Sequence, residues 1–329
     1  MKYAVLTVTE EGQKLAKELN KNLESDPTII KLDLYHKNVK NTLSTIFSCY
    51  DCIIGIMATG IMVRNLCPLL RSKLKDPAVL IVGEDRRYVI SLLSGHMGGA
   101  NNLTLKIAGI LGAVPVITTA TDLKNKMGID VLAHNYWLKI TDPSLIIDLN
   151  SFIAADRKPD LFLPSKFWFM LNDPLIVSSY NIQSWHKSFI RASSSGIDLD
   201  LYPKRLVVGL GSKKNVSSNQ VLNALRSALQ ALNLPLERVD VLATGEMKKY
   251  EPGIVDLAYN LGLTLEAISL EALKEFKHPD CSSSEFVESQ FGVKGVSESS
   301  ALIVAGKKAH LIYKKTAFNG VTVAVAVEE

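Results

Sequence analysis

The segment Ser94-Gly95-His96-Met97-Gly98-Gly99-Ala100-Asn101 stands between a strand-like run and a helix-like run. The preceding run, residues 88–93, is apolar and rich in β-branched side chains, which is typical of a buried strand. The following run places apolar residues on one helical face. A glycine-rich turn before a helix leaves backbone N–H groups available, and these bind anions or oxyanions. The pattern predicts a strand–turn–helix unit with a ligand site at the turn.

The elements around this turn predict an α/β fold. We expect strands at residues 3–8, 28–34, 52–57, 78–82, 88–93 and 114–117, with helices between most of them. The run 52–57 is continuously apolar, as in the middle of a parallel sheet. The polar stretch 83–87 predicts a hairpin between its flanking strands. Residues 1–125 are therefore expected to form an N-terminal domain with an open, mostly parallel sheet.

Two further regions follow. Residues 126–203 hold all three tryptophans and several prolines, and we expect a small middle region or connector with an exposed link at 193–196. Residues 204–329 return to alternating strands and helices and predict a second, small α/β domain. In that domain Ser217 and Gln220 predict a capping box, and Ser297 is expected to cap a later helix.

Composition excludes several classes of protein. Hydrophobic residues make up 47% of the 329 residues, which is enough for a packed core. The net charge of +4 comes with no basic block, so no nucleic-acid partner is expected. No apolar run approaches the ~18 residues of a membrane span, and no signal peptide follows Met1. Four cysteines are too few for a disulfide scaffold. We expect a cytoplasmic protein.

Ligands of open α/β sheets bind beyond the carboxyl ends of strands. Residues 58–65, 94–101 and 118–122 each follow a predicted strand with small or polar side chains, and we expect the three segments to converge. Two interpretations are open for His96, a turn histidine bonded to a nearby carbonyl or a functional group. Arg64 is either a carboxylate clamp or a solvated helix residue, and Glu84 fits an ordinary hairpin turn.

Other motifs are weaker. Gly209 and Gly211 follow a strand, but the rest of a dinucleotide fingerprint is missing. Lys213 and Lys214 beside a helix start suit carboxylates or a phosphate better. The pair Cys49 and Cys52 has no second pair at zinc spacing, so no protein-held metal is expected.

The motifs together resemble the CbiG family. The series 60–64, 89–101 and 115–122 resembles the N-terminal domain of these cobalt-precorrin-5A hydrolases of anaerobic cobalamin biosynthesis. Residues 208–214, 251–253, 295–298 and 321–326 resemble their C-terminal domain, which is similar to the small CobE-type protein. One departure is clear. Where the family usually has Gly-Cys-Arg-(Arg or Lys)-Gly, this chain has Gly211-Ser212-Lys213-Lys214-Asn215, which removes a thiol and the bidentate geometry of arginine.

The resemblance implies a reaction in corrin metabolism. The substrate is a cobalt-bearing tetrapyrrole whose ring A acetate forms a δ-lactone on C20. The enzyme opens the lactone and releases C20 with its methyl group as acetaldehyde, which gives cobalt-precorrin-5B. Cobalt belongs to the substrate, so no cofactor is expected. Partners to test are neighbouring methyltransferases of the pathway and a second copy of the chain in a homodimer.

We hypothesise that His96 is the general base, that the N–H groups of Gly98 and Gly99, with Arg64, stabilise the oxyanion or hold a flanking carboxylate, and that Glu84 is the next base to test. The expected substrate-binding residues are Thr59, Gly60, Ser94, Gly95, Gly98, Gly99, Asn101, Thr119, Asp122, Gly211, Lys213, Lys214, Ser297 and Glu298. Two alternatives stay open at this point. One is a non-catalytic tetrapyrrole carrier or scaffold, and the other is a nucleotide-dependent α/β enzyme.

Overall fold

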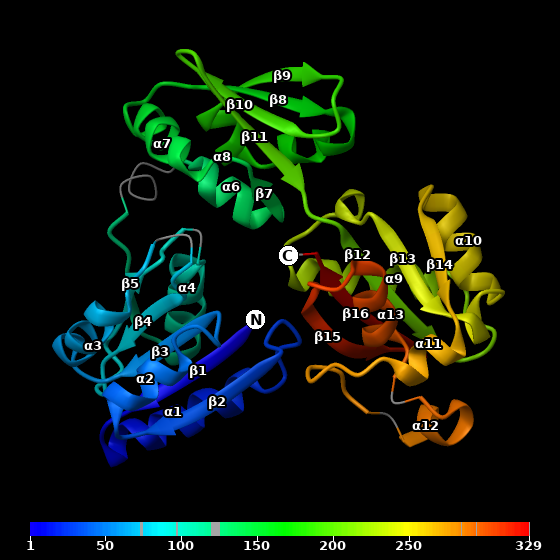
Figure 1. Ribbon diagram of the computed structural model, residues 1–329, viewed down its shortest axis with the longest axis horizontal. Coiled ribbons are helices and arrows are strands. Elements are labelled where there is room, and N and C mark those ends of the chain that lie inside the picture. Colours follow the sequence, from blue (N-terminus) through cyan, green and yellow to red (C-terminus); the bar gives the residue numbers. More distant parts are fainter. Residues whose placement is uncertain (73–74, 97, 120–125, 284, 294, 329) are drawn as a thin grey trace. The chain divides into compact units, whose positions relative to one another are not determined.

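The computed structural model describes residues 1–72, 75–96, 98–119, 126–283, 285–293 and 295–328. It holds three β-sheets of six, five and five strands, and the predicted α/β class is confirmed (Figure 1). The chain divides into two compact units, residues 1–26 with 31–203, and residues 27–30 with 204–329. The first unit contains the first two sheets, and the second unit contains the third.

The first sheet has the strand order β2-β1-β3-β4-β5-β6 (Figure 1). Its strands are β1 (Lys2–Thr7), β2 (Lys31–His36), β3 (Cys52–Ile56), β4 (Ala78–Val82), β5 (Tyr88–Leu93) and β6 (Val114–Val116). Its helices are α1 (Glu10–Leu23), α2 (Val39–Ile46), α3 (Thr59–Leu66) and α4 (Ala100–Leu111). Helices α2 and α3 pack on one face of β1, β3 and β4, and α1 packs against α4. The mostly parallel sheet and the hairpin at 83–87 are both confirmed.

Strand direction divides this sheet into two functional edges. Strands β1 to β4 run parallel to one another, whereas β5 pairs antiparallel with β4 and parallel with β6. We call the carboxyl ends of β1 to β4 the forward edge. The opposite edge, where β5 and β6 end, is the turn edge. The five residues of β4 put about 13 Å between the two edges.

The predicted convergence of three strand ends is therefore wrong. Residues 58–65 follow β3 at the forward edge, while residues 94–101 follow β5 at the turn edge. Only 94–101 and the residues after β6 meet, because β5 and β6 are parallel neighbours. The hairpin at 83–87 reverses the chain, and this reversal carries the glycine turn away from the end of β3.

Short-range sequence signals predicted the start of α1 correctly but misplaced one strand. Thr9 caps α1, since its side chain accepts a hydrogen bond from Gly12 N–H, as its sequence position indicates. The strand expected at 28–34 lies instead at Lys31–His36. Residues 27–30 belong to the second unit, where Lys314 N–H donates to Pro27 O and Ile30 packs on that unit's core. Tertiary contacts thus override the β-propensity of that run.

Residues 126–203 are more than a connector. They form their own sheet in the order β7-β11-β10-β8-β9 around a buried apolar cluster. The strands are β7 (Leu138–Ile140), β8 (Asp160–Pro164), β9 (Asn181–Trp185), β10 (Ile190–Ser194) and β11 (Ile197–Pro203), and the helices are α6 (Ile129–Asn135), α7 (Ile146–Ala154) and α8 (Pro174–Ser179). The expected link at 193–196 is wrong. Ser195 and Gly196 both have positive φ and form the tight hairpin between β10 and β11.

The second unit contains the sheet β14-β13-β12-β16-β15. Its strands are β12 (Leu206–Ser212), β13 (Val241–Gly245), β14 (Thr264–Ile268), β15 (His310–Phe318) and β16 (Val321–Val327), and its helices are α9 (Ser218–Ala231), α10 (Pro252–Leu261), α11 (Leu270–Glu275), α12 (Glu285–Phe291) and α13 (Ser297–Ala305). The capping box of Ser217 and Gln220 is confirmed. Ser297 does not cap α13, because the helix begins one residue earlier than predicted, with Val296 at the N-cap.

Candidate active site at the turn edge

Three backbone N–H groups at the end of the glycine turn, those of Gly99, Ala100 and Asn101, are bonded within the turn. Gly99 adopts a left-handed conformation with φ of 77° and precedes α4. Its N–H donates to His96 O at 2.9 Å, and the next two N–H groups donate to Ser94 O at 3.2 Å and Gly95 O at 3.0 Å. The prediction that Gly99 offers a free N–H to an oxyanion is therefore wrong. These three N–H groups are therefore not available to an anion.

Asn101 connects the turn to β5 and to the segment after β6 through side-chain hydrogen bonds. Its side chain is 5% exposed, accepts a hydrogen bond from Ser91 Oγ at 2.7 Å and donates to Thr119 Oγ1 at 2.8 Å. A Cβ at Gly95 would lie 2.7 Å from Asn101 Oδ1, so only glycine allows this approach. The structure thus brings Asn101 and Thr119 together as a clamp between β5 and the segment after β6. Asp122 lies outside the described residues.

Ser94 and Gly98 hold the turn against β4. Ser94 Oγ donates to Asp76 O at 2.9 Å, just before that strand. A Cβ at Gly98 would lie 2.6 Å from Ser94 Cβ and 3.2 Å from Ala78 N. These contacts show that Gly98 packs closely against Ser94 and Ala78. They also restrict the position of His96, which lies between Ser94 and Gly98 in the sequence.

His96 pairs with the carboxylate of Asp130, which was not among the predicted site residues. Its Nδ1 lies 3.2 Å from Asp130 Oδ2, and the two side chains are only 16% and 5% exposed. Asp130 stands in the first turn of α6, beyond the predicted N-terminal domain. An aspartate at Nδ1 favours the tautomer that carries its proton there, so that the lone pair of the neutral ring lies on Nε2. A histidine oriented in this way is suited to act as a general base.

The carboxylate of Asp130 is itself held in place. Its Oδ1 accepts hydrogen bonds from Asn150 Nδ2 at 2.8 Å and from Val131 N–H at 3.1 Å. Burial pushes the pKa of Asp130 upward, but the hydrogen bond and charge of His96, with those two donors, bring its pKa below the ordinary value. Asp130 is therefore ionised at neutral pH and available to stabilise a protonated imidazole.

The segment before Asp130 is anchored to α8. Met127 N–H donates to Ser179 Oγ at 2.9 Å, and Tyr180 OH donates to Met127 O at 2.9 Å. Burial, and then the nearby charge of Asp130, raise the pKa of Tyr180 well above its ordinary value, so the phenol stays a neutral donor. This anchoring fixes the start of α6 and with it the carboxylate.

The other predicted residues of the first unit lie at the forward edge. Thr59 and Gly60 begin α3, and Arg64 lies exposed in its last turn. Glu84 is exposed in the hairpin and accepts a hydrogen bond from Thr9 Oγ1 at 2.6 Å. The structure therefore does not place Arg64 or Glu84 beside His96. Glu84 supports the cap of α1, which is the ordinary role for an acidic turn residue.

The predicted residues of the second unit divide into two groups. Lys213 and Lys214 are exposed after β12, where cations are available to carboxylates. Gly211 is buried, and a Cβ there would lie 2.4 Å from Thr322 Oγ1. Ser297 and Glu298 are 1% and 2% exposed.

Glu298 accepts hydrogen bonds from three groups of its own unit. They are Ser282 N–H, Ser282 Oγ and Lys315 N–H, at 2.7, 2.8 and 2.9 Å. Glu298 thus joins three segments of the unit, and this geometry contradicts a role in holding substrate.

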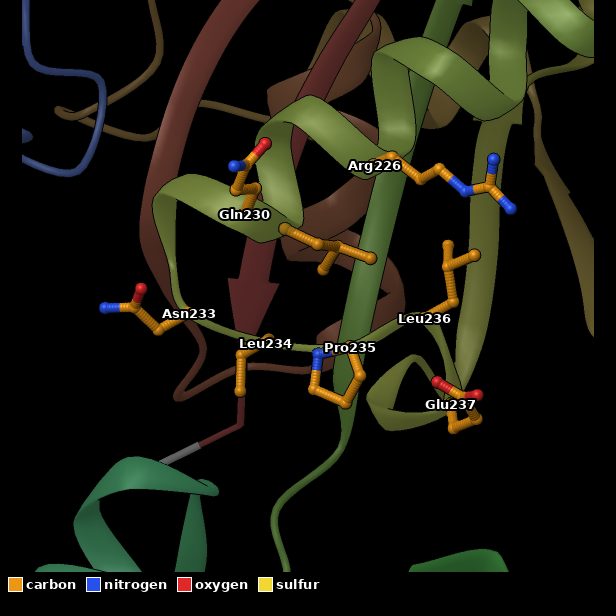
Figure 2. A pocket seen from close by; sticks show the side chains of 8 residues that line it. Arg226, Gln230, Asn233, Leu234, Pro235, Leu236 and Glu237 are labelled. Carbon is orange, nitrogen blue, oxygen red and sulfur yellow. The ribbon is translucent and has the colours of Figure 1, made fainter. Parts of the chain in front are cut away.

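Several other features of the described residues bear on function. No group of three or more His, Cys, Asp or Glu side chains in them is arranged to hold a metal ion. None of the helices in that part of the chain has the length and apolar character needed to cross a membrane. A shallow hollow lies at the end of α9 and along residues 233–237 (Figure 2). None of the predicted site residues lines this hollow. The candidate site is therefore identified by its side chains at the turn edge and not by this hollow.

Sequence reasoning missed Asp130, Asn150 and His134. All three lie in the region predicted to be a small middle region or connector, in which no site residue is predicted. A usable signal existed in the run Ile129-Asp130-Val131-Leu132-Ala133-His134. Two polar residues four positions apart in an otherwise apolar run share one face of a helix.

Comparison with known proteins agrees with this chemistry. Residues 41–122 match the family model "Cobalamin synthesis G N-terminal", and residues 206–326 match "Cobalamin synthesis G C-terminus". A Methanocaldococcus jannaschii protein named probable cobalt-precorrin-5A hydrolase is 33% identical over 340 residues, which cover 100% of this chain and 99% of that protein. The cobalt-precorrin-5A hydrolase of Salmonella typhimurium is 31% identical over 300 residues, covering 87% of this chain and 85% of that protein.

A solved structure supports the same relationship. The crystal structure of a cobalamin biosynthesis protein G homologue from Sulfolobus solfataricus superposes with a TM-score of 0.63 at 26% identity, covering 99% of this chain and 97% of that one. The matching region includes the glycine turn, the α6 segment and the second unit. The chain is therefore a hydrolase of the cobalamin synthesis G family.

Proposed function

We propose that this chain hydrolyses cobalt-precorrin-5A, opening its ring A lactone and releasing acetaldehyde, at the turn edge of the first sheet. The observation that carries the assignment is the 3.2 Å contact between His96 Nδ1 and the buried carboxylate of Asp130. The names of the curated relatives supply the substrate. Cobalt enters as part of that substrate, and the proposed reaction uses no cofactor of the protein.

The geometry suggests how the lactone is opened. His96 Nε2 takes a proton from water, the hydroxide attacks the acyl carbon, and Asp130 stabilises the imidazolium that forms. Gly98 N–H is the remaining predicted donor for the tetrahedral oxyanion, because the N–H groups of Gly99, Ala100 and Asn101 are bonded within the turn. Arg64 takes no part in this step.

Carboxylates at the substrate periphery need cations. The exposed side chains of Lys213 and Lys214 supply positive charge in the second unit, although each lacks the fork geometry of arginine. We place the reaction in the cytoplasm, since all four cysteines are free thiols, as expected in a reducing compartment. Neighbouring methyltransferases and a homodimer remain the proposed partners.

The test is the anaerobic conversion of cobalt-precorrin-5A by the full chain, with acetaldehyde and the corrinoid product both measured. The wild-type protein should release acetaldehyde, and His96→Ala should slow its release ~10²- to 10⁴-fold. His186→Ala is the matched control, because His186 is exposed in the loop that follows β9 (Asn181–Trp185). Tight binding of the substrate by the wild-type protein without acetaldehyde would instead indicate a carrier and would contradict the proposal.

A further inference from the structure

Helix α6 brings a second imidazole to the glycine turn. Asp130 and His134 are four residues apart on this helix, so their side chains share one face. Asp130 contacts His96, while His134 Nε2 lies 3.1 Å and its Cε1 3.4 Å from where a Cβ at Gly99 would be. One face of α6 thus contacts two points of the turn, the histidine and the glycine three residues after it.

The position of His134 is held by the surrounding structure. Its ring stacks on Trp137, with 6.4 Å between centroids and 28° between planes. Trp137 adopts a φ of 55°, a left-handed conformation that bulky residues rarely take and that costs about 1–2 kcal/mol. Gly99 leaves room for the imidazole as well as meeting its own φ of 77°. The imidazole is therefore placed, half-buried, against the turn.

The proposed reaction needs more than one proton transfer. Water adds its hydroxyl to the acyl carbon, and the electron pair of the acyl C–O bond goes to the oxygen on C20. That alkoxide collapses to acetaldehyde, and the electron pair of the bond between C20 and the ring stays on the macrocycle. The macrocycle takes up one proton as that bond breaks. The first step needs a base and the second needs a proton donor, while no oxidant or reductant is consumed.

We propose that His134 is this proton donor, acting after His96 has opened the lactone. The assignment rests on the proposed function, since it divides that reaction between two imidazoles. His96 has a carboxylate partner that favours its role as base, and it releases the proton it accepts to solvent before the next turnover. His134 delivers a separate proton to the macrocycle and is reprotonated from solvent, so that protons balance over one turnover.

The test is His134→Gln in the full chain, given cobalt-precorrin-5A without oxygen and followed by mass spectrometry and acetaldehyde assay. The lactone should open at close to the wild-type rate, and a corrinoid heavier by one water should accumulate. Acetaldehyde release should fall ~10²- to 10⁴-fold. His96→Ala should give neither the opened acid nor acetaldehyde, and His186→Gln should behave as the wild-type protein. His134→Asn, with a shorter amide, replaces His134→Gln if the latter does not melt as the wild-type protein does.

Three results separate the possible failures. Wild-type release of acetaldehyde by His134→Gln overturns the assignment of His134. Equal loss of lactone opening and acetaldehyde by a folded variant, with no intermediate, also overturns it, because the two steps would then share one group. An intact lactone with the wild-type protein instead overturns the proposed function itself.

Discussion

The two edges of the first sheet carry the same order of strand, turn and helix but differ in environment. At the forward edge, β3 leads into α3 through Thr59 and Gly60, and Arg64 lies exposed. At the turn edge, β5 leads into α4 through the glycine turn, and His96 is 16% exposed beside an ionised carboxylate. Both edges offer a strand–turn–helix unit with a polar side chain. At the turn edge, helix α6 from the region of the second sheet supplies Asp130 and His134.

The difference between the two edges indicates that the backbone of the turn alone does not form the candidate site, and that the side chains beside it are needed. The backbone N–H groups of Gly99, Ala100 and Asn101 are bonded within the turn. What distinguishes the turn edge is the desolvated pair of His96 and Asp130, whose interaction is stronger in a buried environment than between exposed side chains. The forward-edge pair of Thr9 and Glu84 is exposed and serves helix capping. Five substitutions test this contrast, in order of expected effect.

Asp130→Asn should have the largest effect on turnover. The amide removes the negative charge that stabilises the imidazolium, so acetaldehyde release should fall roughly 10²- to 10⁴-fold with little change in KM. Asp142→Asn is the matched control, because Asp142 is an exposed helix cap that bonds Ser144. A wild-type kcat for Asp130→Asn would show that His96 works without its carboxylate.

Gly98→Ala should disturb the turn edge through packing. The new methyl group would lie 2.6 Å from Ser94 Cβ and 2.9 Å from Ser94 O, so we expect a loss of about 1–3 kcal/mol of unfolding free energy and reduced activity. Gly109→Ala in the last turn of α4 meets nothing within 4 Å and should instead stabilise the protein by about 0.5–1 kcal/mol. Denaturant unfolding compares the two, and equal stabilities would refute the close packing of the turn.

Thr9→Ala, at the forward edge, should lower stability without lowering activity. It removes the cap of α1 and the bond to Glu84, which lowers the unfolding free energy by about 1 kcal/mol. Its kcat should stay at the wild-type value, since the variant leaves the turn edge intact. A large loss of kcat, with the melting temperature hardly changed, would place chemistry at the forward edge.

Arg64→Ala and Glu84→Gln should have the smallest effect. Both side chains are exposed at the forward edge, so acetaldehyde release should remain within about twofold of the wild-type rate, as for typical surface changes. Steady-state kinetics on both variants measures this. A loss comparable to that of His96→Ala would restore Arg64 to the catalytic group and reverse the contrast between the edges.

Local patterns predicted much of this molecule. The α/β class, the cap at Thr9, the capping box at Ser217 and the strand–turn–helix unit around His96 all follow from short-range chemistry, and all are confirmed. Strand direction was not predictable in the same way. The expected convergence with Arg64 failed because the hairpin before β5 reverses the chain, and Asp130 was missed because a long-range contact brings it to His96. Periodicity shows which residues share a face, but it does not show which faces meet.

A double-mutant cycle tests the central claim most directly. His96→Gln, Asp130→Asn and the variant with both changes are compared by the rate constant for acetaldehyde release from cobalt-precorrin-5A. If Asp130 acts through His96, the double variant should be no slower than His96→Gln alone, because groups that act as one unit are not additive. If the two losses multiply, His96 and Asp130 act independently, and the assignment of a carboxylate-oriented base is contradicted.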